Sequence, residues 1–352
     1  MLVEFDQKVQ TVYGNILVNI YGDRNKHPIL TFHDIGLNAQ QTFRDFFQFL
    51  TVEELGGEFC IYNVNAPGQQ KEADTFPSWY NFPTMDEMVT MIHDLVQFFN
   101  LKSFIGLGIG AGANLLLRYA AKHQEKVDGL ILINCVYTKA NWTEWGYQNL
   151  NASLLKNIGP NNFTTDYLLW HHLGTHIENV SQTKIKELRH LYNHIKNPVN
   201  LAGFIESYVN RTHVHVTTKC HKDPNFTVPV LQIVGEGSAF LHEAEHLNSM
   251  LDHKNSELVK FAECGGDVLN ERPDKATEAI LLFLQGCGYF PWLNVRKVVK
   301  KIRRTTSEEE TTISSNEDDA TTRSIRGSVS DDFGYFYDGN ISPIEPNIPR
   351  VF

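Results

Sequence analysis

Long apolar runs are missing from this sequence, and so is any pair of cysteines in a C-x-x-C arrangement. No apolar stretch approaches the roughly 20 residues that a membrane-spanning helix needs. The five cysteines are an odd number, and we expect Cys60, Cys135 and Cys264, which end apolar runs, to be buried and reduced. The first residues hold no basic segment followed by an apolar one, so no signal peptide is expected. Together these absences predict an intracellular, cytoplasmic protein.

An excess of positive charge is also absent. Lys and Arg number 31 against 41 Asp and Glu, which gives a formal net charge of −10. This balance argues against a general nucleic-acid binder. The chain of 352 residues is otherwise ordinary in composition, being 42% hydrophobic and 11% aromatic. It is long enough for one large core with an inserted subdomain.

Short apolar runs alternate with helix-period segments along much of the chain. After an opening hairpin, with its turn predicted at Gly14 and Asn15, this alternation predicts a mostly parallel sheet with helices on both faces. Thr84 and Glu87 have capping-box spacing at the start of one helix, and Pro273 suits the first turn of the last one. Eight strands are predicted, at residues 10–13, 16–21, 29–33, 59–64, 104–107, 127–136, 228–235 and 257–262.

Two segments depart from this alternation. Strand signals are rare in residues 138–223, where helix-like segments carry three of the five tryptophans. We therefore expect a helical cap inserted into an α/β core formed by residues 1–137 and 224–293. From residue 294 a basic run is followed by Ser and Thr mixed with Glu and Asp. With few large apolar residues, residues 294–352 cannot offset the entropy of ordering and are predicted to be a disordered tail.

A glycine-rich stretch, Gly108-Ile109-Gly110-Ala111-Gly112, lies between a strand-like run and a helix-period run. This is the sequence form of a tight strand–turn–helix elbow, in which glycines permit a strained backbone. In α/β-hydrolases the elbow reads Gly-x-Ser-x-Gly and presents the nucleophilic serine. The middle position here is Gly110. The sequence therefore predicts the α/β-hydrolase fold with the turn kept and the nucleophile missing.

The acid and the base of a hydrolase triad are missing from their expected positions too. The acid position holds Ser238, and the base position falls at Gly266 and Asp267, where there is no histidine. The donors of an oxyanion hole are recognisable in the elbow residue Ala111 and in a loop where hydrolases carry His-Gly. That loop consists of His33, Asp34, Ile35 and Gly36. We expect a vestigial oxyanion hole beside an empty triad.

A resemblance to a known family rests on eight segments of the sequence. These are Val9–Gly14, Ile29–Asn38, Asn65–Gly68, Gly106–Ala113, Arg118–Ala120, Gly129–Asn134, Cys264–Gly266 and Phe283–Tyr289. In them, residues 1 to 293 closely resemble the N-myc downstream-regulated (NDRG) family. The resemblance implies an α/β-hydrolase fold without hydrolase activity, and cytosolic roles in differentiation, growth control and stress signalling. It also implies a C-terminal tail phosphorylated by basophilic kinases. The chain departs from the family pattern at Asp267, where relatives often have glutamine, and its tail lacks the tandem repeats of some members.

The tail holds three candidate phosphorylation sites. Arg303 stands three residues before Thr306, and Arg304 three before Ser307, which is the spacing that basophilic kinases read. Ser328 follows a weaker basic pattern. A phosphate would add about −1.5 to −2 charges beside the basic run and change its contacts. The basic run is also suited to weak contact with anionic membranes, at about 1 kcal/mol per residue near the surface.

Cofactor and metal sites are not expected. Residues 108–113 also match the dinucleotide fingerprint, but they lie well inside the sheet instead of on its first strand. The histidine pairs of the cap, His190 with His194 and His213 with His215, lack a carboxylate or cysteine at a recognised metal-binding spacing. We expect these histidines to be surface or packing residues.

Two functional alternatives stay open beside a non-catalytic protein that acts through partner proteins of unknown identity. The first is a hydrolase with a displaced nucleophile, for which Ser78 and Ser238 are the serines to test. The second is a small-molecule binding module that uses the pocket beneath the cap, which would show ligand-dependent thermal stabilisation.

Overall fold

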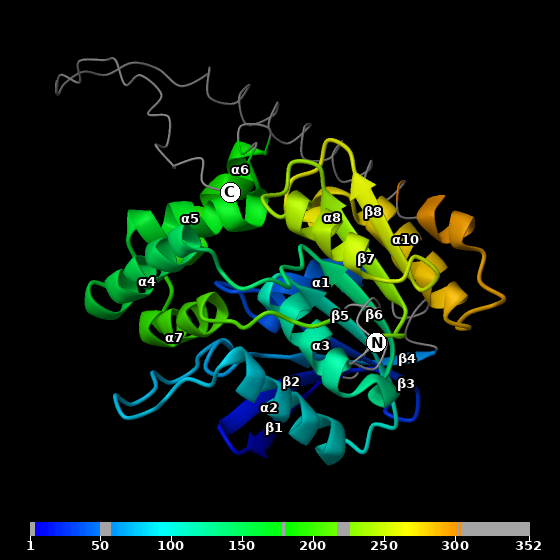
Figure 1. The fold of residues 1–352 in the computed structure, drawn as a ribbon, viewed down its shortest axis with the longest axis horizontal. Coiled ribbons are helices and arrows are strands. Elements are labelled where there is room, and N and C mark those ends of the chain that lie inside the picture. The colour runs from blue at the N-terminus through cyan, green and yellow to red at the C-terminus, as the bar shows by residue number, and fades with distance from the viewer. Residues whose placement is uncertain are drawn as a thin grey trace, which may run out of the picture. The chain divides into compact units, whose positions relative to one another are not determined.

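The structure is a computed structural model, and residues 4–49, 58–175, 177, 180–216, 226–300 and 303 are described from it. Its strands form one sheet of eight, in the order β1-β2-β4-β3-β5-β6-β7-β8 (Figure 1). The pairs β1–β2 and β2–β4 are antiparallel and all the others are parallel, so the predicted sheet is confirmed. The strands are β1 (Glu4–Thr11), β2 (Gly14–Tyr21), β3 (His27–Phe32), β4 (Phe59–Val64), β5 (Phe104–Ile109), β6 (Val127–Ile133), β7 (Val230–Gly235) and β8 (Ser256–Phe261).

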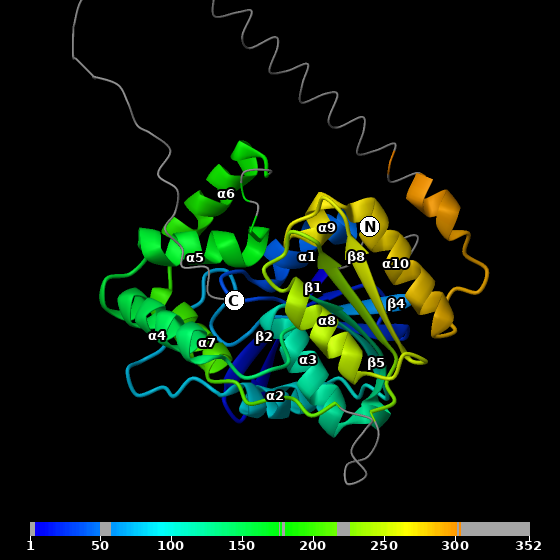
Figure 2. The same ribbon diagram turned by 45° about the horizontal axis from the view of Figure 1, so that its top comes forward.

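Helices cover both faces of this sheet. Figure 2 shows α2, α3 and α8 along one face and α1, α9 and α10 on the other. Every residue of β4 and β7 is buried, as expected for parallel strands covered on two sides. The helices of the core are α1 (Ala39–Phe49), α2 (Met85–Phe98), α3 (Ala111–Lys122), α8 (Leu241–Met250), α9 (Val268–Glu271) and α10 (Pro273–Gly286), with a short 3₁₀ turn η1 (Gln124–Lys126).

The opening hairpin turns two residues earlier than predicted. Thr11 pairs directly with Gly14, which leaves Val12 and Tyr13 as the turn. The Thr11 hydroxyl donates to the Gly14 carbonyl at 2.8 Å and accepts from the Tyr13 amide at 3.3 Å. Gly14 opens β2 with a φ of +113°, a conformation that favours glycine. The capping box of Thr84 and Glu87 at the start of α2 is present as predicted.

Four helices fill the described part of the segment predicted as a cap. They are α4 (Trp142–Asn157), α5 (Asn162–Leu173), α6 (Gln182–Asn193) and α7 (Pro198–Val209), and they gather beside the sheet in both views (Figures 1 and 2). The buried guanidinium of Arg118, in α3, ties this segment to the core, since it donates to the hydroxyl and to the carbonyl of Thr212. Residues 1–299 form one compact unit, so core and cap pack together.

The predicted tail boundary at residue 294 is too early. Residues 295–300 are helical, and the side chains of Val295, Val298 and Val299 are buried. These three valines give the segment an apolar face. Basic residues lie between them, so the overall composition of the segment did not indicate that it packs against the core. The rest of the predicted tail, apart from Arg303, lies outside the described residues. None of the described helices is both long enough and apolar enough to cross a membrane.

Candidate functional site

The elbow predicted from the glycines is present between β5 and α3. Gly110 has φ +52° and ψ −112°, and its amide donates to the Ile133 carbonyl at the end of β6. Its own carbonyl accepts the first hydrogen bond of α3, from the Asn114 amide at 3.0 Å. A Cβ atom at Gly112 would overlap the backbone of Phe32, so a glycine is needed for the helix to approach β3 this closely.

The carboxylate of Asp34 occupies the space in front of the elbow. Its Oδ1 accepts hydrogen bonds from the backbone amides of Ile35 and Ala111, both at 2.8 Å. A Cβ atom built at Gly110 would overlap this carboxylate. The loop of residues 33–36 and the elbow therefore meet as predicted, but the two amides bind a side chain of the protein itself.

A histidine of the cap completes this arrangement. Nε2 of His171, in α5, lies 2.7 Å from Oδ2 of Asp34, and both side chains are buried. Burial opposes ionisation of Asp34, but the charge and hydrogen bond of His171, with smaller contributions from His172 and the Ala111 amide, outweigh it. The pKa of Asp34 therefore lies below its usual value, and the carboxylate is charged at neutral pH.

Two further buried histidines hold the loop in place. His33 Nε2 accepts from the Ala66 amide at 2.9 Å, so the proton is on Nδ1, which lies 2.7 Å from the Asp34 carbonyl. His172 Nε2 donates to the Ile35 carbonyl at 2.9 Å. Burial lowers the pKa of His33 and that of His172 to about 4. Both rings are thus neutral at pH 7 and act as hydrogen-bonding struts.

The acid and base positions lie side by side and are joined by Asn134, which follows β6. The Ser238 hydroxyl donates to Oδ1 of Asn134 at 2.9 Å, and Nδ2 of Asn134 donates to the Gly266 carbonyl at 2.7 Å. The Asp267 carboxylate accepts from Nδ2 of Asn270 and lies 3.6 Å from Nζ of Lys184. Ser238 and Asp267 are therefore engaged in structural contacts, and the bridging role of Asn134 was not foreseen from the sequence.

We expect Asn134→Ala to destabilise the protein by about 2 kcal/mol. The substitution removes both side-chain hydrogen bonds and places alanine at a φ of +51°. Urea unfolding measures the change. Asn134→Gly, which tolerates the positive φ but lacks the amide, should recover part of the loss. Equal stability of the wild type and both variants would show that the bridge contributes nothing.

The C-terminal end of α5 closes over these positions. The Leu173 carbonyl accepts from the Gly266 amide at 3.1 Å, and the Thr175 amide donates to the Gly237 carbonyl at 2.9 Å. A Cβ atom at Gly266 would overlap the backbone of His172. The position predicted for the catalytic base is thus filled by the backbone of the cap.

The remaining predicted residues lie elsewhere. Gly36 packs against Leu168 of α5, and the exposed Ser78 lines a separate groove beside α7. Thr306, Ser307 and Ser328 lie outside the described residues. The predicted histidine pairs do place their rings together, with centroids 4.0 Å apart for His190 and His194 and 5.1 Å apart for His213 and His215. Within the described ranges, no three histidine, cysteine or acidic side chains converge as a metal site.

Comparison with known proteins places the chain in a family. Residues 6–291 match the model of the Ndr family. The chain belongs to the Ndr family. The resemblance inferred from its sequence is thereby confirmed.

Relatives within the Ndr family align over most of their length. The chain is 33% identical to Protein NDRG2 of Pan troglodytes over 289 residues, covering 80% of this chain and 77% of the relative. It is 34% identical to Protein NDRG3 of Xenopus tropicalis over 296 residues, covering 81% and 74%. Among solved structures, an esterase from Thermogutta terrifontis superposes with a TM-score of 0.65 at 18% identity, covering 80% of this chain and 99% of the esterase. The Ndr-family chain therefore has the α/β-hydrolase fold.

Two features of the site in this Ndr-family chain escaped the sequence analysis, namely the role of the Asp34 side chain and the contribution of His171. One signal was available for the first, since a charged residue stands where hydrolases carry glycine. Asp34 is larger than that glycine, whereas Gly110 is smaller than the serine of a hydrolase elbow. The two differences together indicate that the Asp34 side chain takes the space that the serine would occupy. No local pattern pointed to His171, which is 137 positions away from Asp34.

Proposed function

We propose that this protein is a non-catalytic α/β-hydrolase-fold protein. It acts in intracellular signalling, growth, differentiation and stress responses through protein interactions and a phosphorylated C-terminal tail. The non-catalytic part rests on the site geometry, and the biological part rests on membership of the Ndr family. The proposed location is the cytoplasm.

One observation carries the non-catalytic proposal, namely the Asp34 carboxylate bound to the Ile35 and Ala111 amides. Hydrolysis of an ester needs such amides to stabilise the oxyanion that forms in the transition state. A carboxylate held there repels a developing negative charge and occupies the donors. Gly110 supplies no nucleophile, and Asp34 leaves no room for one.

A fluorophosphonate probe, read by intact mass, tests this proposal. We expect no adduct on the full-length protein under conditions in which an active serine esterase is labelled to completion. Ser238 and Ser78 are the serines to watch, since the first donates to Asn134 and the second lies on an exposed loop. A stoichiometric adduct that Ser238→Ala or Ser78→Ala abolishes would establish a displaced nucleophile and overturn the proposal.

The tail proposal needs its own experiment. Incubation of the full chain with a basophilic Ser/Thr kinase, followed by peptide mapping, should place phosphate on Thr306, Ser307 or Ser328. Replacing Arg303 and Arg304 by alanine should suppress the first two sites and leave Ser328 unchanged. Phosphate on other residues, or unchanged phosphorylation of Thr306 and Ser307 after the two arginines are replaced, would contradict the proposed regulation.

A further inference from the structure

A groove of about 610 Å³ lies between the loop of residues 76–84 and helix α7. Three aromatic rings of the loop line it, those of Phe76, Tyr80 and Phe82. Phe76 and Tyr80 are stacked with ring centroids 4.0 Å apart, and the Phe82 ring stands at 69° to the first and 86° to the second. The loop therefore presents a cluster of rings to the groove.

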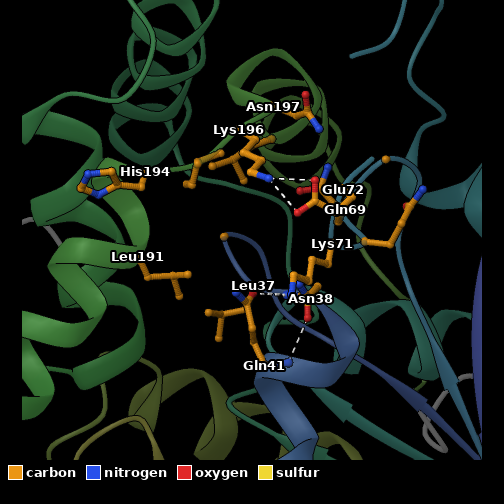
Figure 3. Close-up of a pocket in the computed structure, with 15 residues that line it drawn as sticks. Leu37, Asn38, Gln41, Gln69, Lys71, Glu72, Leu191, His194, Lys196 and Asn197 are labelled. Atoms are coloured by element: carbon orange, nitrogen blue, oxygen red, sulfur yellow. Dashed lines mark hydrogen bonds and ion pairs between the residues drawn. The ribbon is translucent and has the colours of Figure 1, made fainter. Parts of the chain in front are cut away.

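The loop wall of the groove is held by α7 and the residues just before it. Oδ1 of Asn200 accepts from the Phe76 amide at 2.9 Å, and Nδ2 of Asn200 donates to the Asp74 carbonyl at 2.9 Å. Lys196 forms an ion pair with Glu72 at 2.7 Å, as Figure 3 shows. These contacts tie the loop to α7, so the groove is already formed in the folded protein.

Apolar side chains at the groove and beside it are exposed. Val199 of α7 lines the groove and is 37% exposed, and Trp79, between the groove residues Ser78 and Tyr80, is 78% exposed. Trp145 of α4 is 44% exposed, and its Nε1 donates to Asn210, another residue of the lining. Exposed aromatic surface of this kind is typical of sites that bind other polypeptide segments.

The charges in the groove balance each other. Its charged lining residues are Lys156 and Glu206, which pair at 2.6 Å. An apolar occupant without net charge is therefore favoured over a strongly acidic or basic one. Segments with Pro-x-x-Pro spacing are such occupants, because they bind to aromatic-lined grooves as preformed polyproline II helices.

The chain itself contains a segment with this chemistry. Pro343, Pro346 and Pro349 stand three residues apart. A polyproline II helix has three residues per turn, so in that conformation the three prolines share one face. Within residues 341–350 the charged residues are Glu345 and Arg350, which leaves the segment without net charge, like the groove.

We propose that the groove binds residues 343–349 of the same chain, with the prolines packed against the aromatic rings. Residues 304–342 connect Arg303 to Pro343. A chain of that length spans about 130 Å when extended and about 35 Å as a coil. A compact unit of about 300 residues has a radius of gyration of about 19 Å, so the connection is long enough. The bound segment closes the groove to other proline-containing partners.

A fluorescein-labelled peptide of residues 341–350, capped at both ends, tests the proposal by fluorescence polarisation. It is titrated with the full-length protein and with a full-length variant that carries Pro343→Ala, Pro346→Ala and Pro349→Ala. In the wild type the linked segment competes at an effective concentration on the order of 1 mM. We expect the peptide to bind the triple variant at least about tenfold more tightly than the wild type. A peptide with the same three substitutions should bind neither protein.

Matched substitutions in the triple variant locate the binding. Val199→Glu places a charge in the groove and should abolish binding. Leu282→Glu is the control, since Leu282 is 53% exposed on α10 and does not line the groove. Both positions are exposed, so neither substitution removes core packing.

Four outcomes would overturn the proposal. The peptide could bind the wild type and the triple variant equally, or bind neither. Val199→Glu and Leu282→Glu could have the same effect, which would place the binding elsewhere. An unrelated peptide with Pro-x-x-Pro spacing could bind the wild type more tightly than the chain's own segment, which would assign the groove to a partner protein. None of these results depends on phosphorylation or on a reactive serine, so they are independent of the kinase and fluorophosphonate experiments.

Discussion

Replacing Gly110 by serine, which restores the hydrolase sequence at the elbow, is expected to destabilise the protein by about 3 kcal/mol. The new Cβ atom would overlap the Asp34 carboxylate, and the residue has a φ of +52°. Asp34 cannot move aside freely, because it is held by the Ile35 and Ala111 amides and by His171. Urea unfolding measures the loss.

Two further variants separate this clash from a general cost of serine. Gly146, on the exposed side of α4, has no atom within 4 Å of its Cβ position. Gly146→Ser should change stability by less than about 1 kcal/mol, in the stabilising direction, because serine is the better helix former. Combining Gly110→Ser with Asp34→Gly should cost at least about 1 kcal/mol less than the sum of the two single changes.

Additive effects of Gly110→Ser and Asp34→Gly would contradict the overlap inferred from the structure. The double variant also extends the test of function. It presents a serine at the elbow with both amides free, yet Ser238 and Gly266 still supply neither acid nor base. We expect no ester turnover from it.

Stability is expected to fall as the pH decreases from 6.5 to 4.5, by about 2 to 3 kcal/mol for each of His33 and His172. Burial lowers the pKa of both to about 4 in the folded protein, whereas the unfolded value is near 6.5. Below pH 6.5 the unfolded chain therefore binds protons that the folded protein does not. The contribution is fully present above pH 6.5 and is lost as the pH approaches 4. The lowered pKa of Asp34 acts in the same direction at still lower pH.

Urea unfolding at pH 7.5, 6.5, 5.5 and 4.5 tests this dependence. His172→Gln should flatten the profile, because glutamine retains a donor for the Ile35 carbonyl but does not titrate. The control is His253→Gln, since His253 is exposed and loses little hydration on folding. The explanation fails if His172→Gln and His253→Gln give the same profile as the wild type.

The fold was predictable because its signals are local. Eight apolar runs of strand length, separated by helix-period segments, indicated the sheet, and the structure has eight strands there, although β1 spans Glu4–Thr11 and not the predicted 10–13. The elbow was predictable because only glycine suits the backbone at Gly110 and Gly112. The hairpin turn and the tail boundary were wrong by a few residues. The position of the turn is fixed by the hydrogen bond of the Thr11 hydroxyl to Gly14, and the helix beyond residue 294 is held by the buried valines of residues 295–299.

The sequence by itself determined that this chain folds as an α/β-hydrolase, and it led to the prediction that Gly110, Ser238 and Gly266 stand where a triad would. Only the tertiary structure decided what fills the site. Asp34 and His171 meet across 137 positions, and the end of α5 packs against the loops that follow β7 and β8. Such contacts depend on how packed elements orient their side chains, and no pattern along the chain records that orientation.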